Sequence, residues 1–218
     1  MNARQLTIPA ALALAGSAHA NIQITEWMYN GANATGEFVE FTNLGTAPVS
    51  FEGWSFDDDS RIPGTVSLSA IGTLAPGASA LLVESTAEAF RAAWGLSASV
   101  AIVGGNTNNL GRADEINLFD ATGALVDRLT YGDAVFPGSP RTLNFSGNPV
   151  SLDALVPFSV SSSWVLAAVG DGFGSYASSF GDVANPGSFA LAVPEPGSWA
   201  LMLAGAGVLA GLARRRQA

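Results

Sequence analysis

Short apolar stretches separated by turn residues fill the chain between residues 21 and 193, and this spacing limits the possible fold more than any other feature. Within each stretch apolar residues recur at the period of a strand. Clusters of glycine, proline, asparagine and aspartate interrupt them every eight to fifteen residues. Such a pattern is typical of two packed sheets and not of alternating β/α units. The sequence therefore predicts an all-β fold, a β-sandwich.

The pattern also places individual elements. We expect strands, in chain order, at 22–29, 37–43, 49–51, 53–56, 65–69, 78–84, 100–103, 115–119 and 125–131. Residues 87–94 are the predicted helix, because Ser85 or Thr86 can cap its first turn and Gly95 can end it. Residues 104–111 are predicted to form a long exposed loop, and the Gly/Pro/Ser-rich stretch 132–162 leaves the register of the last strands open.

Alternation further predicts that Trp54 is largely buried between the sheets, on the same face as Phe56. The same argument places four residues on one face of the first strand, because each is two positions from the next: Ile22, Ile24, Glu26 and Met28.

The C-terminus carries three consecutive signals. Pro194, Glu195 and Pro196 form a stiff extended stem, since each proline restricts its own backbone and that of the preceding residue. Residues 197–213 are 17 residues without a charge, the lower limit for a helix that spans a membrane. The cluster of Arg214, Arg215 and Arg216 follows, as expected at a cytoplasmic end. The alternative, a buried C-terminal helix, would show a polar face, and this run is apolar all round.

The N-terminus resembles a secretory signal peptide. A short positive region precedes an apolar run of about ten residues, too short to span a bilayer. Ala18-His19-Ala20 then provides the small-x-small pattern that signal peptidase recognises, so cleavage is expected after Ala20. An uncleaved anchor is the alternative. The predicted organisation is a signal peptide at 1–20, one domain at 21–190 and a sorting signal at 193–216.

The residue types that remain after residue 20 exclude many kinds of catalytic site. The chain has no cysteine and no lysine, and its single histidine is His19. Ser-His-Asp and Cys-His sites, zinc sites with nitrogen and sulfur ligands, and Schiff-base lysines are therefore excluded. Carboxylates, hydroxyls, tyrosines and arginines are what remains, and we expect a protein that is not an enzyme.

The charge of the domain excludes another class of partner. Residues 21–193 contain 17 acidic residues and five arginines, a net charge of −12. Such a surface repels the phosphates of nucleic acids, so we expect no nucleic-acid partner. It is compatible with divalent cations.

The C-terminal signals closely resemble the PEP-CTERM sorting signal of Gram-negative bacteria, over Pro194–Arg216. The resemblance implies an exosortase as partner, a membrane protease or transpeptidase that recognises Pro-Glu-Pro. It implies export, transient anchoring in the inner membrane, cleavage near the motif and delivery to the cell surface or extracellular matrix. We therefore expect the mature protein to lack Arg214–Arg216.

The middle of the chain resembles a lamin-tail domain over most of residues 21–188. The matching motifs, in order, are Ile22-x-Ile24-x-Glu26, Glu37-Phe38-Val39-Glu40-Phe41-x-Asn43-x-Gly45, Gly53-Trp54, Leu74-x-Pro76-Gly77, Asp114-Glu115-x-x-Leu118-x-Asp120-x-x-Gly123, Val126-Asp127, Ser163-Trp164 and Asn185-Pro186-Gly187. The resemblance implies an immunoglobulin-like β-sandwich that is commonly exported and acts as an interaction domain.

Two clusters of acidic residues are candidates for a metal-binding or catalytic site, and the first is a pair of glutamates. If the first hairpin loop is centred on Asn33, Glu26 lies opposite Glu40 and Met28 opposite Phe38. Facing carboxylates repel each other, so they need a shared proton, an arginine, backbone donors or Ca²⁺. Acid/base catalysis is a further alternative.

The second candidate is the acidic corner Asp57, Asp58 and Asp59, which could provide oxygen ligands for Ca²⁺ or be a solvated turn. Three functions follow: a noncatalytic surface or matrix protein associated with exopolysaccharide, a calcium-dependent carbohydrate binder that uses an exposed Trp54 or Trp94, or a secreted hydrolase. We expect the first, with no cofactor unless Ca²⁺ binds.

Overall fold

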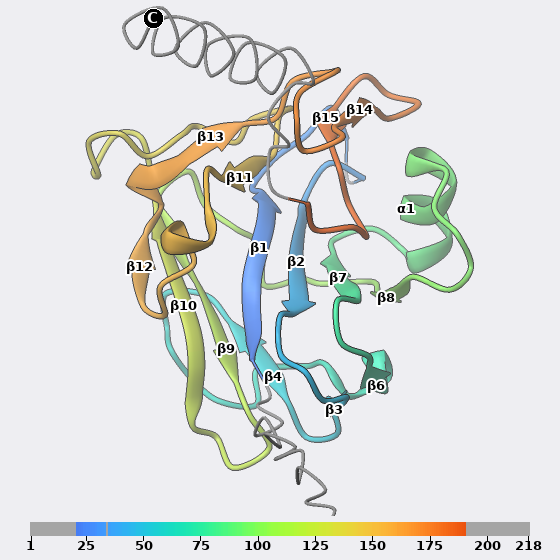
Figure 1. Cartoon of the computed structure of the whole chain (residues 1–218), viewed down its shortest axis with the longest axis vertical. Helices are drawn as coiled ribbons and strands as arrows, with labels where there is room; N and C mark the ends of the chain where they lie inside the picture. Colours follow the sequence, from blue (N-terminus) through green and yellow to red (C-terminus); the bar gives the residue numbers. More distant parts are fainter. Residues whose placement is uncertain (1–20, 34, 191–218) are drawn as a thin grey trace, which may run out of the picture.

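The computed structural model describes residues 21–33 and 35–190 as two packed β-sheets with one α-helix at the side (Figure 1). The predicted signal peptide with Ala18 and Ala20, and the sorting signal with Pro194–Pro196 and Arg214–Arg216, lie outside the described residues. Within those residues, no helix combines the length and the apolar character that crossing a membrane requires.

The first sheet has six strands. In spatial order they are β13 (Trp164–Leu166), β11 (Gly147–Pro149), β1 (Ile22–Met28), β2 (Phe38–Asn43), β7 (Ser79–Val83) and β8 (Ala101–Val103). Neighbours pair antiparallel except β7 and β8, which run parallel. Strand β11 lies within the stretch 132–162 and β13 directly after it, and the sequence had left the register of these last strands open.

The second sheet has five strands and packs against the first. In spatial order they are β12 (Ser159–Val160), β10 (Leu125–Tyr131), β9 (Asp114–Phe119), β4 (Ser55–Asp57) and β5 (Val66–Ser67). Two further pairs are β3 (Val49–Ser50) with β6 (Thr73–Leu74) and β14 (Tyr176–Ala177) with β15 (Val183–Ala184). Three short 3-10 helices lie between strands: η1 (Ser69–Ile71) between β5 and β6, η2 (Leu152–Ala154) between β11 and β12, and η3 (Ser161–Ser163) between β12 and β13. The predicted all-β architecture, with strands near the expected ranges, is confirmed.

The helix α1 (Ala87–Trp94) has the predicted bounds. Thr86 caps it, since its hydroxyl accepts a hydrogen bond from the Ala89 amide at 3.2 Å. Gly95 ends it in the left-handed conformation, with φ of 63°. Of the two possible caps, Thr86 is therefore the one that the structure uses.

The main core lies between the two sheets and centres on three aromatic rings. Trp27 contacts Tyr131 and Trp164, with ring centroids 5.1 and 5.0 Å apart. Gly147 lies under the Trp27 ring, where an added Cβ would be 2.5 Å from Cζ3. Trp54 is partly buried and packs against this core on the side of Phe56, so its predicted face is confirmed and its burial is less complete than that of Phe56.

A second, smaller core covers the opposite face of the six-stranded sheet. There α1 packs its buried Phe90 and Trp94 against Met28, Phe38 and Leu81. Neighbouring residues of the same strands, such as Trp27, belong to the main core, as the alternation of strand side chains requires. The six-stranded sheet is thus buried on both faces.

A β-bulge at Thr25 divides β1 into two parts. Ile24 pairs with Phe41, whereas Glu26 pairs with Glu40, so Thr25 is the extra residue. The prediction that Ile22, Ile24, Glu26 and Met28 share one face is therefore wrong. Ile22 and Ile24 lie in the main core and Met28 in the second core, because the bulge reverses the alternation.

The loop at 104–111 is confirmed, but it is not fully exposed. Leu110 and Asn106 are buried, and the Leu110 amide donates to Glu37 Oε1 at 3.0 Å. This contact holds the loop against the start of β2. The Gly/Asn-rich composition had predicted an exposed loop and did not indicate these buried residues.

Candidate functional site

Glu26 and Glu40 lie directly opposite each other on β1 and β2, as the hairpin arithmetic predicted. Met28 lies opposite Phe38, which confirms the same register. The two carboxylates are almost completely buried, with 1% and 0% of the residue exposed. We call Glu26 and Glu40 the glutamate pair.

Each member of the glutamate pair accepts a backbone N–H from the end of the domain. Glu26 Oε1 accepts from the Asn185 amide at 2.9 Å and also from the hydroxyl of Ser146. Glu40 Oε2 accepts from the Gly187 amide at 2.7 Å, and its Oε1 accepts from the Thr25 hydroxyl at 2.8 Å. Backbone donors and hydroxyls, rather than an arginine, therefore surround the pair.

These contacts fasten a C-terminal strap, residues 183–190, onto the sheet. Figure 1 shows the chain after β15 passing over β2 on the face that carries α1. An added Cβ on Gly187 would meet Val100 at 3.1 Å, and Gly187 has a φ of 85°, so glycine suits this position on both counts. The last described segment before the sorting signal is thus part of the fold.

Burial changes the protonation of the pair. Desolvation, with the nearby charge of Glu40 as a second cause, raises the pKa of Glu26 to about 8. Desolvation also raises the pKa of Glu40 to about 7, although the Thr25 hydroxyl and the Gly187 amide oppose the shift. The pair therefore retains a proton near neutral pH. Glu26 Oε2 is buried without a hydrogen-bond partner.

The acidic corner does not converge on one point. Asp57 is buried and accepts hydrogen bonds from the Ser60 hydroxyl at 2.6 Å and from Asn108 at 3.1 Å. Burial alone would raise its pKa, but these bonds outweigh it and the pKa is lowered. Asp59 is exposed, and Asp58 is half-buried. Across residues 21–33 and 35–190, no group of three or more acidic or histidine side chains has a geometry that could hold a metal ion.

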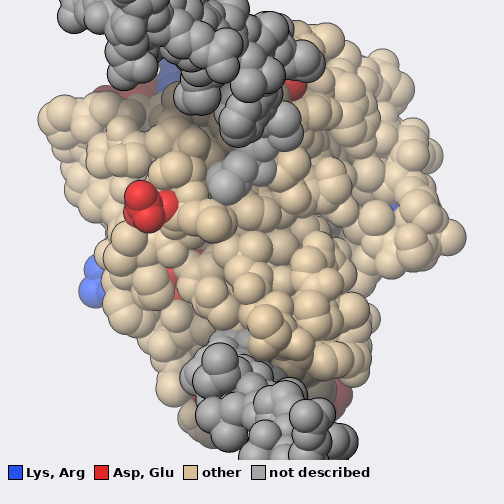
Figure 2. Space-filling model, viewed as in Figure 1, with Lys and Arg blue, Asp and Glu red and all other residues tan. Residues whose placement is uncertain are grey.

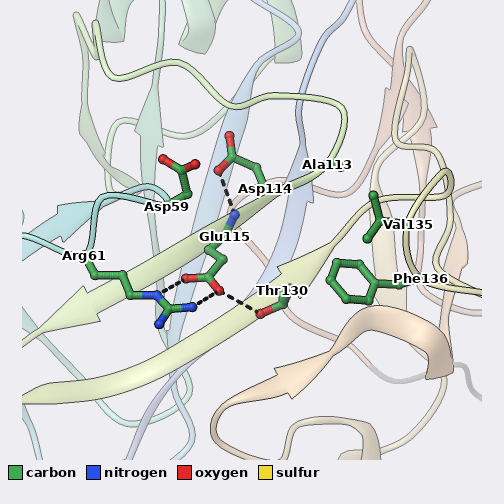
Figure 3. Close-up of a pocket in the computed structure, with 8 residues that line it drawn as sticks. All are labelled: Asp59, Arg61, Ala113, Asp114, Glu115, Thr130, Val135 and Phe136. Atoms are coloured by element: carbon green, nitrogen blue, oxygen red, sulfur yellow. Dashed lines mark hydrogen bonds and ion pairs between the residues drawn. The ribbon is translucent and has the colours of Figure 1, made fainter.

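An open groove lies beside this corner and has a volume of about 370 Å³ (Figure 3). Its lining residues come from three separate segments and are Asp59, Arg61, Ala113, Asp114, Glu115, Thr130, Val135 and Phe136. Figure 3 shows Val135 and Phe136 on one side and the charged side chains on the other. The sequence analysis missed this groove, because its walls meet only after β4, β9 and β10 have paired.

A two-pronged ion pair organises the charged side of the groove. Arg61 donates from Nε and Nη2 to the two carboxylate oxygens of Glu115, at 2.7 and 2.6 Å. This fork lowers the pKa of Glu115, whereas burial raises the pKa of Asp114, with Asp58 and Asp59 adding to the shift. Arg61 has a φ of 58°, an uncommon value for a residue with a side chain.

The glutamate pair and the groove differ in their access to a substrate or ligand. A substrate cannot contact the glutamate pair unless the strap moves, because the pair is sealed from solvent. The groove, by contrast, is open and combines N–H donors, carboxylate acceptors and an apolar wall. Trp94, one of the two aromatic residues considered for carbohydrate binding, is buried and donates to the Thr35 carbonyl, so it is not available.

Several residues of the lamin-tail motifs have structural tasks. Asn43 donates from its amide to the carbonyls of Ala47 and Leu74, at 2.8 and 3.0 Å. Asp127, on β10, accepts the Ile24 amide at 2.9 Å and so links the two sheets beside the bulge of β1. Asn43 and Asp127 therefore stabilise the fold, whereas Asp114 and Glu115 of another motif line the groove.

Comparison with known proteins agrees with both resemblances. Residues 15–133 match the family model of the Lamin Tail Domain, and residues 192–217 match the PEP-CTERM protein-sorting motif. No curated protein matches the chain. Because the first match covers more than half of the chain, the protein belongs to the Lamin Tail Domain family and carries a PEP-CTERM sorting motif at its C-terminal end.

Proposed function

We propose that this protein is a noncatalytic component of the cell surface or extracellular matrix of a Gram-negative bacterium. The observation that supports this most is the PEP-CTERM protein-sorting motif at residues 192–217, which implies export and exosortase sorting to the surface. The domain that it delivers is a lamin-tail β-sandwich.

The proposed route has three steps. Signal peptidase cleaves after Ala20 during export. The uncharged run 197–213 then holds the protein in the inner membrane, with Arg214–Arg216 on the cytoplasmic side. Exosortase finally cuts near Pro194–Pro196 and releases the domain to the surface.

The residue types of the chain support the proposal that the protein is noncatalytic. The chain has no cysteine or lysine, and its one histidine precedes the proposed cleavage site. The carboxylates with the most raised pKa values, Glu26 and Glu37, are engaged with backbone amides. A hydrolase that used Glu26 and Glu40 would have to open the strap for each substrate.

We infer that the groove is where the domain contacts a matrix polysaccharide. An arginine has five N–H donors, and Glu115 occupies two of those of Arg61, which leaves donors for sugar hydroxyls. Asp59 offers acceptors, and Phe136 and Val135 offer an apolar surface for the C–H face of a sugar ring. A volume of about 370 Å³ is in the range of small-ligand sites. This version of carbohydrate binding needs no calcium.

The sorting step can be tested by the intact mass of protein recovered from the surface of the native host. We expect a chain that begins at residue 21 and lacks Arg214–Arg216. A variant with Pro194→Ala and Pro196→Ala should remain uncut in the membrane fraction. Recovery of a surface chain that ends at Ala218 would reject exosortase processing.

The binding step can be tested with purified exopolysaccharide of the same host. Val135→Asp places a charge in the groove wall and should weaken retention, because Val135 is exposed and its replacement leaves the core intact. Val169→Asp is the matched control, since Val169 is equally exposed but does not line the groove. Equal retention of the two variants would rule out the groove.

A further inference from the structure

One loop exposes an unusual amount of apolar surface. Residues 150–160, which we call the apolar loop, follow β11 and include η2 and the two-residue strand β12. Five large apolar side chains in these eleven residues are each at least 40% exposed, namely Val150, Leu152, Val156, Phe158 and Val160. Asp153 is the one charged residue among them. Single exposed apolar residues are normal, but a concentrated group marks a contact surface.

The backbone of the apolar loop is strained where it presents its largest side chain. Phe158 has a φ of 62°, in the left-handed region that bulky residues rarely adopt. More than half of this residue is nevertheless exposed, so the strain does not serve to bury the ring in the core. Such outliers cluster at functional sites.

Apolar exposure and charge divide the domain into two parts. Of the 13 large apolar residues that are exposed in the described part of the chain, all but Ile62 and Val135 lie between Phe145 and Phe180. Residues 21–133 carry 14 acidic residues and four arginines, a net charge of −10, whereas residues 134–190 carry three and one, a net charge of −2. The described part of the face seen in Figure 2 shows few charged atoms.

The sequence beyond the domain brings this surface near a membrane. Six residues lie between Ala190 and Gly197, where the uncharged run begins, so seven Cα–Cα steps join the two. At no more than about 3.6 Å per step, this linker reaches at most about 25 Å. A domain held this closely must present some face to the bilayer.

We propose that the apolar loop lies on the lipid surface while the tail is still uncut. The inference rests on the proposed anchoring of residues 197–213 in the membrane. Anionic lipid repels the part with a charge of −10 and leaves the nearly neutral part free to approach, so charge and apolar surface favour the same orientation. Valine, leucine and phenylalanine side chains then enter the interface, as in proteins that lie on a membrane.

The absence of cysteine permits a direct test on the full chain. Three single-cysteine variants, Val156→Cys in the loop, Ala121→Cys in the β9–β10 turn and Ala204→Cys in the tail, are labelled with a polarity-sensitive fluorophore. Each is reconstituted into vesicles of phosphatidylethanolamine and phosphatidylglycerol. We expect blue-shifted emission and quenching by brominated lipid at positions 156 and 204, and neither at position 121. Adding Phe158→Asp should abolish the shift at 156 and leave that at 204.

Each other outcome has one meaning. A shift at 204 without one at 156 overturns the loop contact and leaves membrane anchoring intact. Absence of a shift at 204 rejects the anchoring and the inference together. A shift at 121 as large as that at 156 shows that no particular face meets the lipid, and this also overturns the proposal.

Discussion

Replacing Glu26 with glutamine should change how the stability of the domain depends on pH. The pKa of Glu26 is raised to about 8 and that of Glu40 to about 7, chiefly because both are buried, from an ordinary value of 4.5. A group with a raised pKa contributes stability that is complete below pH 4.5 and is lost as the pH rises through the folded value. The wild-type domain should therefore lose stability between pH 5 and pH 8.

The magnitude follows from the number of protons. If the folded glutamate pair holds one proton more than the unfolded chain, the free energy of unfolding falls by about 1.4 kcal/mol for each pH unit. From pH 5 to pH 7 the loss is about 2–3 kcal/mol. For a domain of this size that corresponds to a fall in Tm of roughly 5–10 °C.

Glutamine is uncharged at every pH and still offers an oxygen to the Asn185 amide, as Glu26 does. The Glu26→Gln domain should match wild type near pH 5 and be more stable than wild type at pH 8. Thermal melts at half-unit steps measure this, and Glu37 and Asp127, whose pKa values are also raised, contribute equally to both proteins. Glu52→Gln is the control, because this substitution removes the same charge from an exposed residue that does not contact the strap. Parallel curves for wild type and Glu26→Gln would refute a protonated pair.

Three further substitutions test the fold. Thr86→Ala should cost about 1 kcal/mol through loss of the helix cap, whereas Ser85→Ala next to it should be neutral in urea unfolding. Gly147→Ala should cost about 1–3 kcal/mol, because the new methyl group meets the Trp27 ring, and a neutral result would show that the ring can move freely. Asp127→Ala should cost about 1–3 kcal/mol, since it leaves the Ile24 amide beside the β1 bulge buried without an acceptor; unchanged unfolding would mean that water replaces the carboxylate.

The sequence predicted what depends on local chemistry. The helix bounds followed from a capping residue and a terminating glycine, and the pairing of Glu26 with Glu40 followed from the centre of one hairpin loop. The bulge at Thr25 did not follow, because no residue there differs from ordinary strand chemistry. Its partner, Asp127, lies about a hundred residues away on the other sheet, and only the tertiary fold brings them together.

The groove escaped prediction for a related reason. Arg61 and Glu115 belong to different segments, and a sequence without aligned partners does not say which arginine meets which carboxylate. The partial exposure of Trp54 could not be predicted, because alternation gives the direction of a side chain but not the extent of the sheet that covers it. Strand β4 lies near the margin of the sandwich, where a core-facing side chain still meets water.

The strap links two motifs that the sequence analysis treated separately. Asn185-Pro186-Gly187 appeared as the end of a domain motif, and Pro194–Pro196 as the start of a sorting signal. The glutamate pair holds the first of these to the sheet through two backbone amides, so the fold includes the chain to within a few residues of the stem. Cutting at the stem then leaves the strap and its buried contacts in place. The tail can therefore be removed without unfolding the domain, as the proposed release to the surface requires.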